Sequence, residues 1–422
     1  MIAVCLVAAG GAGAPASAGT ERIHLPGAQV LRGWNGLALD AVRLSRATDA
    51  DAARLYAMVN VAGYDAVNGI TRDRSPALVH GPGPRHADLE AATATAAHAV
   101  LTALDPARAT EYDARLATDL AGLRPGHRRD AGAAWGRQVG ERVVAARATD
   151  GSRPVQSQPA GSGPGAFRTE WTGTQYRDVT PFAVADPAAF VPGPPPALDS
   201  LDYAAAFAEA ALLGNAAIPA PDKLATFQFW SLPAGSVQPA GEWLRIALTV
   251  SGTRPLTEVT RLLALLTMAL ADATVATVQT KFIYRHWRPT TAIREADTDG
   301  NPLTPADPTW AARAGSVGGT PEYVSGHSSY SGAGAAALAG FFCDDRIPFR
   351  HATDSAPGGV ARDYPGFAAA AAEAGRSRIF GGQHFEFSNQ SGLAIGRNIA
   401  TEVLANRLLR RTGPTHHGAC PL

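Results

Sequence analysis

Three short segments between residues 281 and 384 hold the residue types that could do chemistry. They span residues 281–289, 323–327 and 377–384. Together they offer one Lys, two well-placed Arg, a Ser-Gly turn and, at the ends of the second and third segments, His327 and His384. This inventory suits a tetrahedral oxyanion, because cations can neutralise its oxygens while a hydroxyl and backbone N–H groups donate to them. A His can then stand at each end of the axis along which a bond is made.

The first segment combines cations with an expected helix end. Lys281 and Arg288 are seven residues apart, nearly two helical turns, so we expect them to project from one face with Arg285 on the same side. Taken alone, this pattern also fits a solvated basic helix end, where cations suit the helix dipole.

The other two segments are each ambiguous when taken alone. Ser325, Gly326 and His327 stand at an expected helix start, where a Ser commonly caps the helix and where free N–H groups can also bind an anion. Arg378 and His384 flank a Gly-Gly break that lets the backbone approach a ligand closely. A single His in such a place is more often a packed core residue.

The order of the three segments resembles a known signature. Lys-x6-Arg-Pro, then Ser-Gly-His, then Ser-Arg-x5-His is similar to the pattern of the vanadium-dependent haloperoxidase and type-2 phosphatidic acid phosphatase superfamily. From about residue 256 to 398 the chain resembles the soluble, exported bacterial haloperoxidase branch, above all in residues 286–294 and 321–327. The N-terminal helices resemble that branch more loosely.

The resemblance implies a role for each residue. The cofactor-binding residues would be Lys281, Arg288, Ser325, Gly326, Arg378 and His384. His384 would be the axial ligand of vanadate, or the phosphorylated nucleophile in phosphatase relatives. His327 would be the acid–base residue, and Lys281 would polarise bound peroxide. The implied cofactor is vanadate, in a site that phosphate can also occupy.

The same resemblance implies an activity and leaves alternatives open. The first expectation is a haloperoxidase that uses hydrogen peroxide to oxidise halide to a hypohalous-acid-type halogenating species, with a small organic substrate as a further partner. The alternative is an acid phosphatase with a phosphohistidine intermediate on His384. A non-catalytic oxyanion-binding protein is a third alternative, although binding alone does not need His327.

The sequence departs from the family pattern close to these residues. Ser388 stands where the family often has an acid, four residues after the last His. Glu386 does not lie on the same helix face and so does not replace that acid. Val324 replaces the Pro before Ser-Gly-His in the phosphatase type. Thr320 and Val278 replace aromatic or His residues of some haloperoxidases, which leaves the halide preference open.

Helices are the elements expected to position these residues. Apolar residues make up 46% of the chain, and many are Ala, which favours helix over sheet. The expected helices span 30–44, 49–68, 85–104, 106–123, 128–148, 201–213, 222–229, 242–251, 256–287, 325–342, 367–377 and 384–409. The fold class is therefore all-α, with packed helical bundles.

The domain organisation follows from the same pattern. We expect one large domain over 19–422, with supporting helices in 19–250 and catalytic helices in 251–410. Between them, residues 150–196 are dense in Gly, Pro and isolated aromatics. This predicts a long irregular segment that wraps over the surface.

Composition limits the partners and the compartment. Lys+Arg and Asp+Glu both number 37, which argues against a nucleic-acid partner, and no uninterrupted apolar run reaches the ~18 residues of a membrane span. Residues 1–18 resemble a cleavable signal peptide, which predicts a secreted or periplasmic protein. Cys343 and Cys420 would then form a disulfide or remain two thiols. A homodimer is left open.

Overall fold

The computed structural model describes residues 28–414, 416–417 and 420–421 and is mostly helical. The signal-peptide expectation concerns residues outside this description. The first helices are α1 (Ala28–Ser45), α2 (Asp49–Thr71), α3 (Leu89–Leu104), α4 (Ala109–Gly122), α5 (His127–Ala146), α6 (Leu201–Leu213) and α7 (Pro221–Phe229). The later ones are α8 (Gln238–Val250), α9 (Leu256–Tyr284), α10 (Pro289–Arg294), α11 (Gly326–Phe342), α12 (Phe367–Phe380) and α13 (Glu386–Asn406).

The described strands are short antiparallel pairs at the margins of the helices. They are β1 (Ser157–Gln158) with β2 (Trp171–Thr172), β3 (Phe349–His351) with β4 (Arg362–Tyr364), and β5 (His416–His417) with β6 (Cys420–Pro421). The all-α expectation is confirmed.

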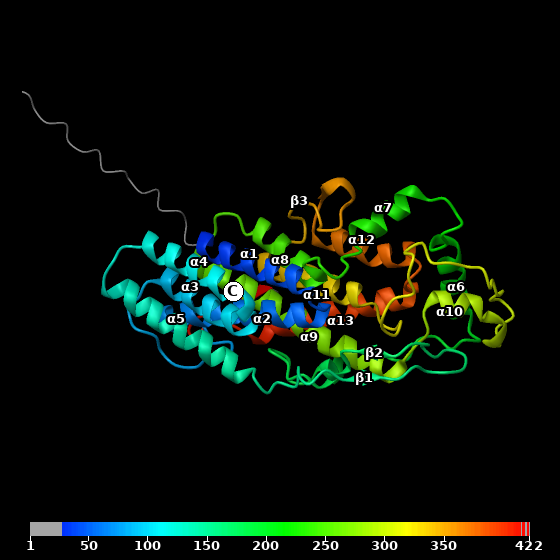
Figure 1. Ribbon diagram of the computed structural model, residues 1–422, viewed down its shortest axis with the longest axis horizontal. Helices are drawn as coiled ribbons and strands as arrows, with labels where there is room; N and C mark the ends of the chain where they lie inside the picture. Colours follow the sequence, from blue (N-terminus) through cyan, green and yellow to red (C-terminus); the bar gives the residue numbers. More distant parts are fainter. Residues whose placement is uncertain (1–27, 415, 418–419, 422) are drawn as a thin grey trace, which may run out of the picture.

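The helices form an elongated bundle (Figure 1). In its centre α2, α9, α11 and α13 run roughly along the long axis, while α3, α4 and α5 gather at one end and α6 and α10 at the other. Where α11 crosses α13, a Cβ on Gly332 would collide with the backbone of Leu393, and one on Gly396 with the backbone of Ser329. Glycines therefore let α11, which begins within the second segment, pack closely against α13, which begins just after the third.

The expected end of the longest helix is wrong, and this error concerns the site. Helix α9 ends at Tyr284 because Arg285 adopts the left-handed conformation, with φ 50°. Arg288 then lies in extended backbone before α10, rather than on one helix face with Lys281. The Arg285 side chain turns away and donates to the Pro159 carbonyl at 2.9 Å, so it belongs to the contact with the wrapping segment.

The segment 150–196 is an ordered wrapping segment, as expected. Its attachment is Asp272, a fully buried carboxylate in the middle of α9. The two carboxylate oxygens accept the backbone N–H groups of Phe182, Ala183 and Val184 at 2.6–2.8 Å. Burial raises the pKa of Asp272 to about 6, although these hydrogen bonds act in the opposite direction.

Two further expectations concern α9 and the cysteines. By length and composition α9 could cross a membrane, but 89% of its most apolar window is buried inside the protein, as in a central core helix.

Cys343 and Cys420 form a disulfide, which confirms the bridged alternative. The bridge ties the C-terminal segment to the end of α11.

Candidate active site

The three segments meet where several helices begin or end. Lys281 is in the last turn of α9 and Arg378 in the last turn of α12. Ser325 caps α11, and Gly326 and His327 are its first residues. Arg288 and His384 lie just before α10 and α13. The side chains of Lys281, Arg288, Ser325, Arg378 and His384 are each at most 5% exposed.

The partners of His384 define the state of its ring. Nδ1 lies 3.0 Å from Glu322 Oε1, and a carboxylate only accepts, so Nδ1 carries the proton. Nε2 lies 2.9 Å from Nη1 of Arg288, which only donates, so Nε2 offers its lone pair. Burial and the adjacent Arg288 hold the pKa of His384 well below its usual value. The ring is therefore a neutral base whose Nε2 faces the cations.

Glu322 is the site residue that the sequence analysis missed. This fully buried carboxylate accepts His384 Nδ1–H and the Phe385 N–H, each at 3.0 Å, and its second oxygen lies 3.4 Å from His286 Nδ1. Its backbone carbonyl accepts from Ser388 Oγ at 3.1 Å. Burial alone would raise the pKa of Glu322, but the bonds from His286 and His384 outweigh it and lower that pKa. The acid that the family pattern places at position 388 is thus supplied by position 322.

Two arginines are held side by side through Gln383. Its carbonyl accepts from Arg288 Nη1 at 2.8 Å, and its side-chain oxygen accepts from Arg378 Nη2. Arg288 also donates Nε–H to the Thr320 carbonyl at 2.8 Å. Burial lowers the pKa of Arg288 to about 10, and burial with repulsion from Arg288 lowers that of Arg378 to about 9. Such crowding of like charges favours a bound anion.

Lys281 completes the set of cations. Its ammonium donates to the carbonyls of Pro321 and Glu322, which brings it to the segment just before Ser325. Burial and the nearby Arg288 hold the pKa of Lys281 well below its usual value. A bound oxyanion would favour the charged form of this lysine.

The start of α11 supplies hydrogen-bond donors. Ser325 Oγ accepts from the Ser328 N–H at 3.3 Å and lies 2.9 Å from the Ser328 hydroxyl, which also lies 2.8 Å from the acceptor Asn389 Oδ1. The first N–H groups of α11 have no intrahelical partner, as at any helix start. Asp49, at the start of α2, lies close by: its Oδ2 would be 3.8 Å from a Cβ on Gly326, and it interacts electrostatically with Lys281.

His327 faces a loop rather than the carboxylate. Its Nε2 donates to the Ser231 carbonyl at 3.2 Å, which leaves the lone pair on Nδ1 in the neutral ring. Burial, with repulsion from Arg378, holds the pKa of His327 well below its usual value. The preceding carbonyl, that of Trp230, accepts from Arg378 Nη1 at 3.3 Å. Residues 230–231 therefore position one arginine and one histidine of the site.

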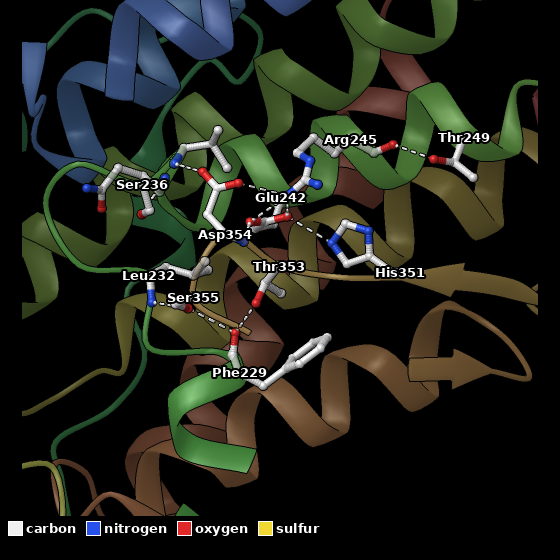
Figure 2. A network of polar contacts seen from close by, with 12 residues as sticks. Phe229, Leu232, Ser236, Glu242, Arg245, Thr249, His351, Thr353, Asp354 and Ser355 are labelled. Carbon is white, nitrogen blue, oxygen red and sulfur yellow. Dashed lines mark hydrogen bonds and ion pairs between the residues drawn. The ribbon is translucent and has the colours of Figure 1, made fainter. Parts of the chain in front are cut away.

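A second polar network holds that loop in place (Figure 2). Thr353 and Ser355 donate their hydroxyls to the Phe229 carbonyl, and Ser355 Oγ accepts the Leu232 N–H at 3.1 Å. The segment that carries these hydroxyls is fixed by Glu242, a fully buried carboxylate of α8. Glu242 lies 2.8 Å from His351 Nε2 and accepts the Asp354 N–H at 2.8 Å. No sequence motif marks this support.

The six cofactor-binding residues predicted from the sequence thus lie around one cluster, with His327 beside it. The cluster contains three cations, one neutral histidine base, a helix start and the fully buried carboxylate Glu322. This donor set fits a tetrahedral oxyanion with an atom that can bond to His384 Nε2. Among the described residues, no group of three or more His, Cys, Asp and Glu could chelate a metal cation.

Comparisons with known proteins agree with this fold. Residues 261–410 match a family model described as the VCPO second helical-bundle domain. The crystal structure of the first bacterial vanadium-dependent iodoperoxidase superposes with a TM-score of 0.78 at 22% identity, covering 93% of this chain and 100% of that one.

Two crystal structures of a bacterial vanadium-dependent chloroperoxidase have the same fold. The apo form gives a TM-score of 0.62 at 16% identity, over 83% of this chain and 92% of that one. The holo form gives 0.63 at 17%, over 85% and 92%. A comparison with curated protein sequences finds no match. The resemblance to vanadium-dependent haloperoxidases expected from the sequence is confirmed.

Proposed function

We propose that this protein is a vanadate-dependent haloperoxidase, which oxidises halide with hydrogen peroxide to a hypohalous-acid-type halogenating species. The observation that carries the proposal is the state of His384. Glu322 accepts a hydrogen bond from the Nδ1–H group, and the Nε2 lone pair faces the buried Arg288. A neutral imidazole nitrogen among cations is what an oxyanion of a metal requires as a ligand.

The residues present fit vanadate. His384 Nε2 would bond to the vanadium, and the oxygens would be held by Lys281, Arg288, Ser325, the Gly326 N–H and Arg378. Bound vanadate supplies a Lewis acid that activates hydrogen peroxide toward halide without changing its own oxidation state. The lowered pKa values of Lys281, Arg288 and Arg378 support this assignment, because their main cause is burial and an anion would compensate the buried charges.

The remaining residues act by orienting and by moving protons. His327 is neutral and can accept a proton at Nδ1 from peroxide or water, since Ser231 holds its Nε2–H. Lys281 places a positive charge beside the oxyanion. Glu322 keeps His384 in one tautomer. The proposal also includes export of the protein, for which the Cys343–Cys420 disulfide is the support.

The same neutral Nε2 would also serve as a phosphorylated nucleophile, so phosphatase activity is the competing outcome. The test uses purified protein with and without orthovanadate. One assay contains hydrogen peroxide with chloride, bromide or iodide, and the other contains a phosphate ester. We expect halogenation that requires vanadate. Phosphate-ester hydrolysis that vanadate inhibits, with no halogenation, would replace this proposal by the phosphatase.

Residues 229–232, which position His327, allow a prediction for a residue outside the cluster. Ser355→Ala removes two hydrogen bonds to residues 229 and 232, so the carbonyls of Trp230 and Ser231 lose their support. We expect kcat to fall about tenfold, because a displacement near 1 Å in a catalytic group can lower the rate by up to about 100-fold. Steady-state kinetics measures this effect.

Two variants control for it. Ser231→Ala keeps the carbonyl that His327 uses and should leave kcat near the parent value. Ser355→Thr keeps the hydroxyl and should recover most of the loss. Equal kcat values in Ser355→Ala and Ser231→Ala would show that the loop does not position His327.

The pKa shifts predict the pH range of the site. Because the pKa of His327 is held well below its usual value, the neutral base persists at lower pH, and activity should fall on the acid side only below about 6.5. The pKa values of Lys281 and Arg378 are also lowered, so anion affinity should fall on the alkaline side as these cations lose their protons.

Bound vanadate favours the charged forms of Lys281 and Arg378. These two residues should therefore lose their protons at higher pH in the vanadate-loaded protein than in the vanadate-free protein. Vanadate affinity and peroxidase rate, each measured from pH 4 to 10, would give a bell governed by coupled groups. An acid limb centred above the usual histidine value would contradict the assignment.

A further inference from the structure

A second strongly basic site lies at the opposite end of α9 from the cluster around His384. It is a cavity of about 780 Å³ whose described lining includes six arginines, Arg72, Arg74, Arg254, Arg261, Arg410 and Arg411. The acidic residues in that lining are Asp73 and Glu258. In a chain whose positive and negative residues are equal in number, this is a concentrated surplus of positive charge.

Arg261 is the most informative of these residues. It is 4% exposed and stacks over the Phe341 ring at 5.3 Å. Nε donates to the Leu408 carbonyl at 3.2 Å, but Nη2 is buried without a hydrogen-bond partner among the described residues. A buried guanidinium with an unused N–H group is costly unless an anion compensates it. Burial and the neighbouring Arg74 also lower the pKa of Arg261 to about 10.

Hydrogen bonds between two distant backbone segments hold the wall of this cavity in place. Residues 73–75 run antiparallel to 409–411, through Ser75 N to Leu409 O at 2.9 Å and Arg411 N to Asp73 O at 3.0 Å. This pairing fixes Arg410 and Arg411 at the cavity. Their side chains make no hydrogen bond or ion pair with the residues that the structure describes, whereas Arg254 lies 3.8 Å from Glu258 and stacks on Phe342 at 4.6 Å.

The cavity is separate from the cluster around His384. Arg261 and Lys281 both lie on α9, twenty residues apart, which is about 30 Å along a helix. In Figure 1 the start of α9 and the end of α13 lie toward the centre of the molecule, and the start of α13 lies toward the end that carries α10. An anion in one site would therefore leave the other free.

We propose that this arginine-lined cavity is a second anion-binding site, which takes a compact ligand with two or more phosphate or sulfate groups. Arg261 would bind one group at the inner wall, and Arg254 and Arg410 would bind another nearer the solvent. Arginine suits this task because its planar N–H groups match the oxygens of phosphate and sulfate in pairs. The proposal does not depend on the function of the cluster around His384.

The test is calorimetric titration of the full chain with inorganic pyrophosphate, and separately with inorganic sulfate, at constant ionic strength. An Arg288→Ala background removes competing binding at the first site. We expect one pyrophosphate site there, and a loss of affinity of at least tenfold when Arg254→Ala and Arg410→Ala are added. Arg346→Ala removes an exposed arginine elsewhere and should have no such effect.

Arg261→Met provides a second measurement that does not depend on surface charge alone. The Leu408 carbonyl keeps its bond from Arg74, so the apolar replacement should keep or raise Tm while pyrophosphate affinity falls at least tenfold. Tighter binding in the pyrophosphate or the sulfate titration identifies the class of ligand. Equal affinity in the Arg254→Ala/Arg410→Ala and Arg346→Ala proteins, or no second site in the parent, would refute the proposal.

Discussion

Replacing His384 by Ala is expected to weaken vanadate binding by more than about 100-fold, the upper end of the loss caused by removing an outer partner of a metal ligand. Peroxidase activity should disappear with it. The reason is that Nε2 of His384 carries a lone pair, directed at the buried Arg288, that can bond to vanadium. Equilibrium dialysis with vanadium analysis measures the affinity.

Phosphate is a sharp control for this variant. It matches vanadate in shape and charge, and its binding needs only the hydrogen bonds and charges of the other residues. His384→Ala should therefore lose much less phosphate affinity than vanadate affinity. If both ligands lose affinity equally, or if vanadate still binds as in the parent, His384 is not the metal ligand.

Replacing Glu322 by Gln is expected to lower vanadate affinity by about 10- to 100-fold, as for other partners that orient a ligating histidine. It removes the one negative charge that both His286 and His384 face. The pKa values of His384 and Lys281 should fall further, since Glu322 raises both. Lys281 should then lose its proton at lower pH, so the alkaline loss of vanadate binding should begin earlier.

The variant should also be less stable by about 1.5–3 kcal/mol, the range for losing a hydrogen bond to a charged group. Asp65→Asn is the matched control for stability. Asp65 is a buried carboxylate of α2 that accepts three backbone N–H groups. Its loss should destabilise the fold and leave the vanadate affinity of the folded protein unchanged. A Glu322→Gln protein that behaves like this control would show that Glu322 is purely structural.

The sequence predicted where the helices lie better than where they end. Helix α6 has its expected bounds because Ser200 caps it and the Ala-rich run is unambiguous. Helix α9 was expected to reach Trp287, but it ends earlier, because the left-handed conformation of Arg285 follows from its contacts with the wrapping segment. Such a contact with a distant part of the chain leaves no local signal.

The candidate site shows the same division. Its cations and histidines follow a spacing that can be read from the sequence, whereas Glu322 cannot be assigned that way. It stands three residues before Ser325 and its partner is 62 positions away, so only the fold brings Glu322 and His384 together. The sequence showed that the acid of the family pattern is missing at position 388, but not which residue takes its place. The arginine-lined cavity combines four distant parts of the chain and has no motif.

Asp272 has a consequence for how this chain is made in a cell. Helix α9 has 29 residues, and the mean hydropathy of its most apolar window is 1.6. Before folding, the membrane-insertion machinery could therefore recognise this segment as a candidate membrane span. An Asp near the centre of such a span opposes insertion by about 2.5–3.5 kcal/mol. The carboxylate that binds the wrapping segment in the folded protein thus also disfavours insertion of the same helix before folding.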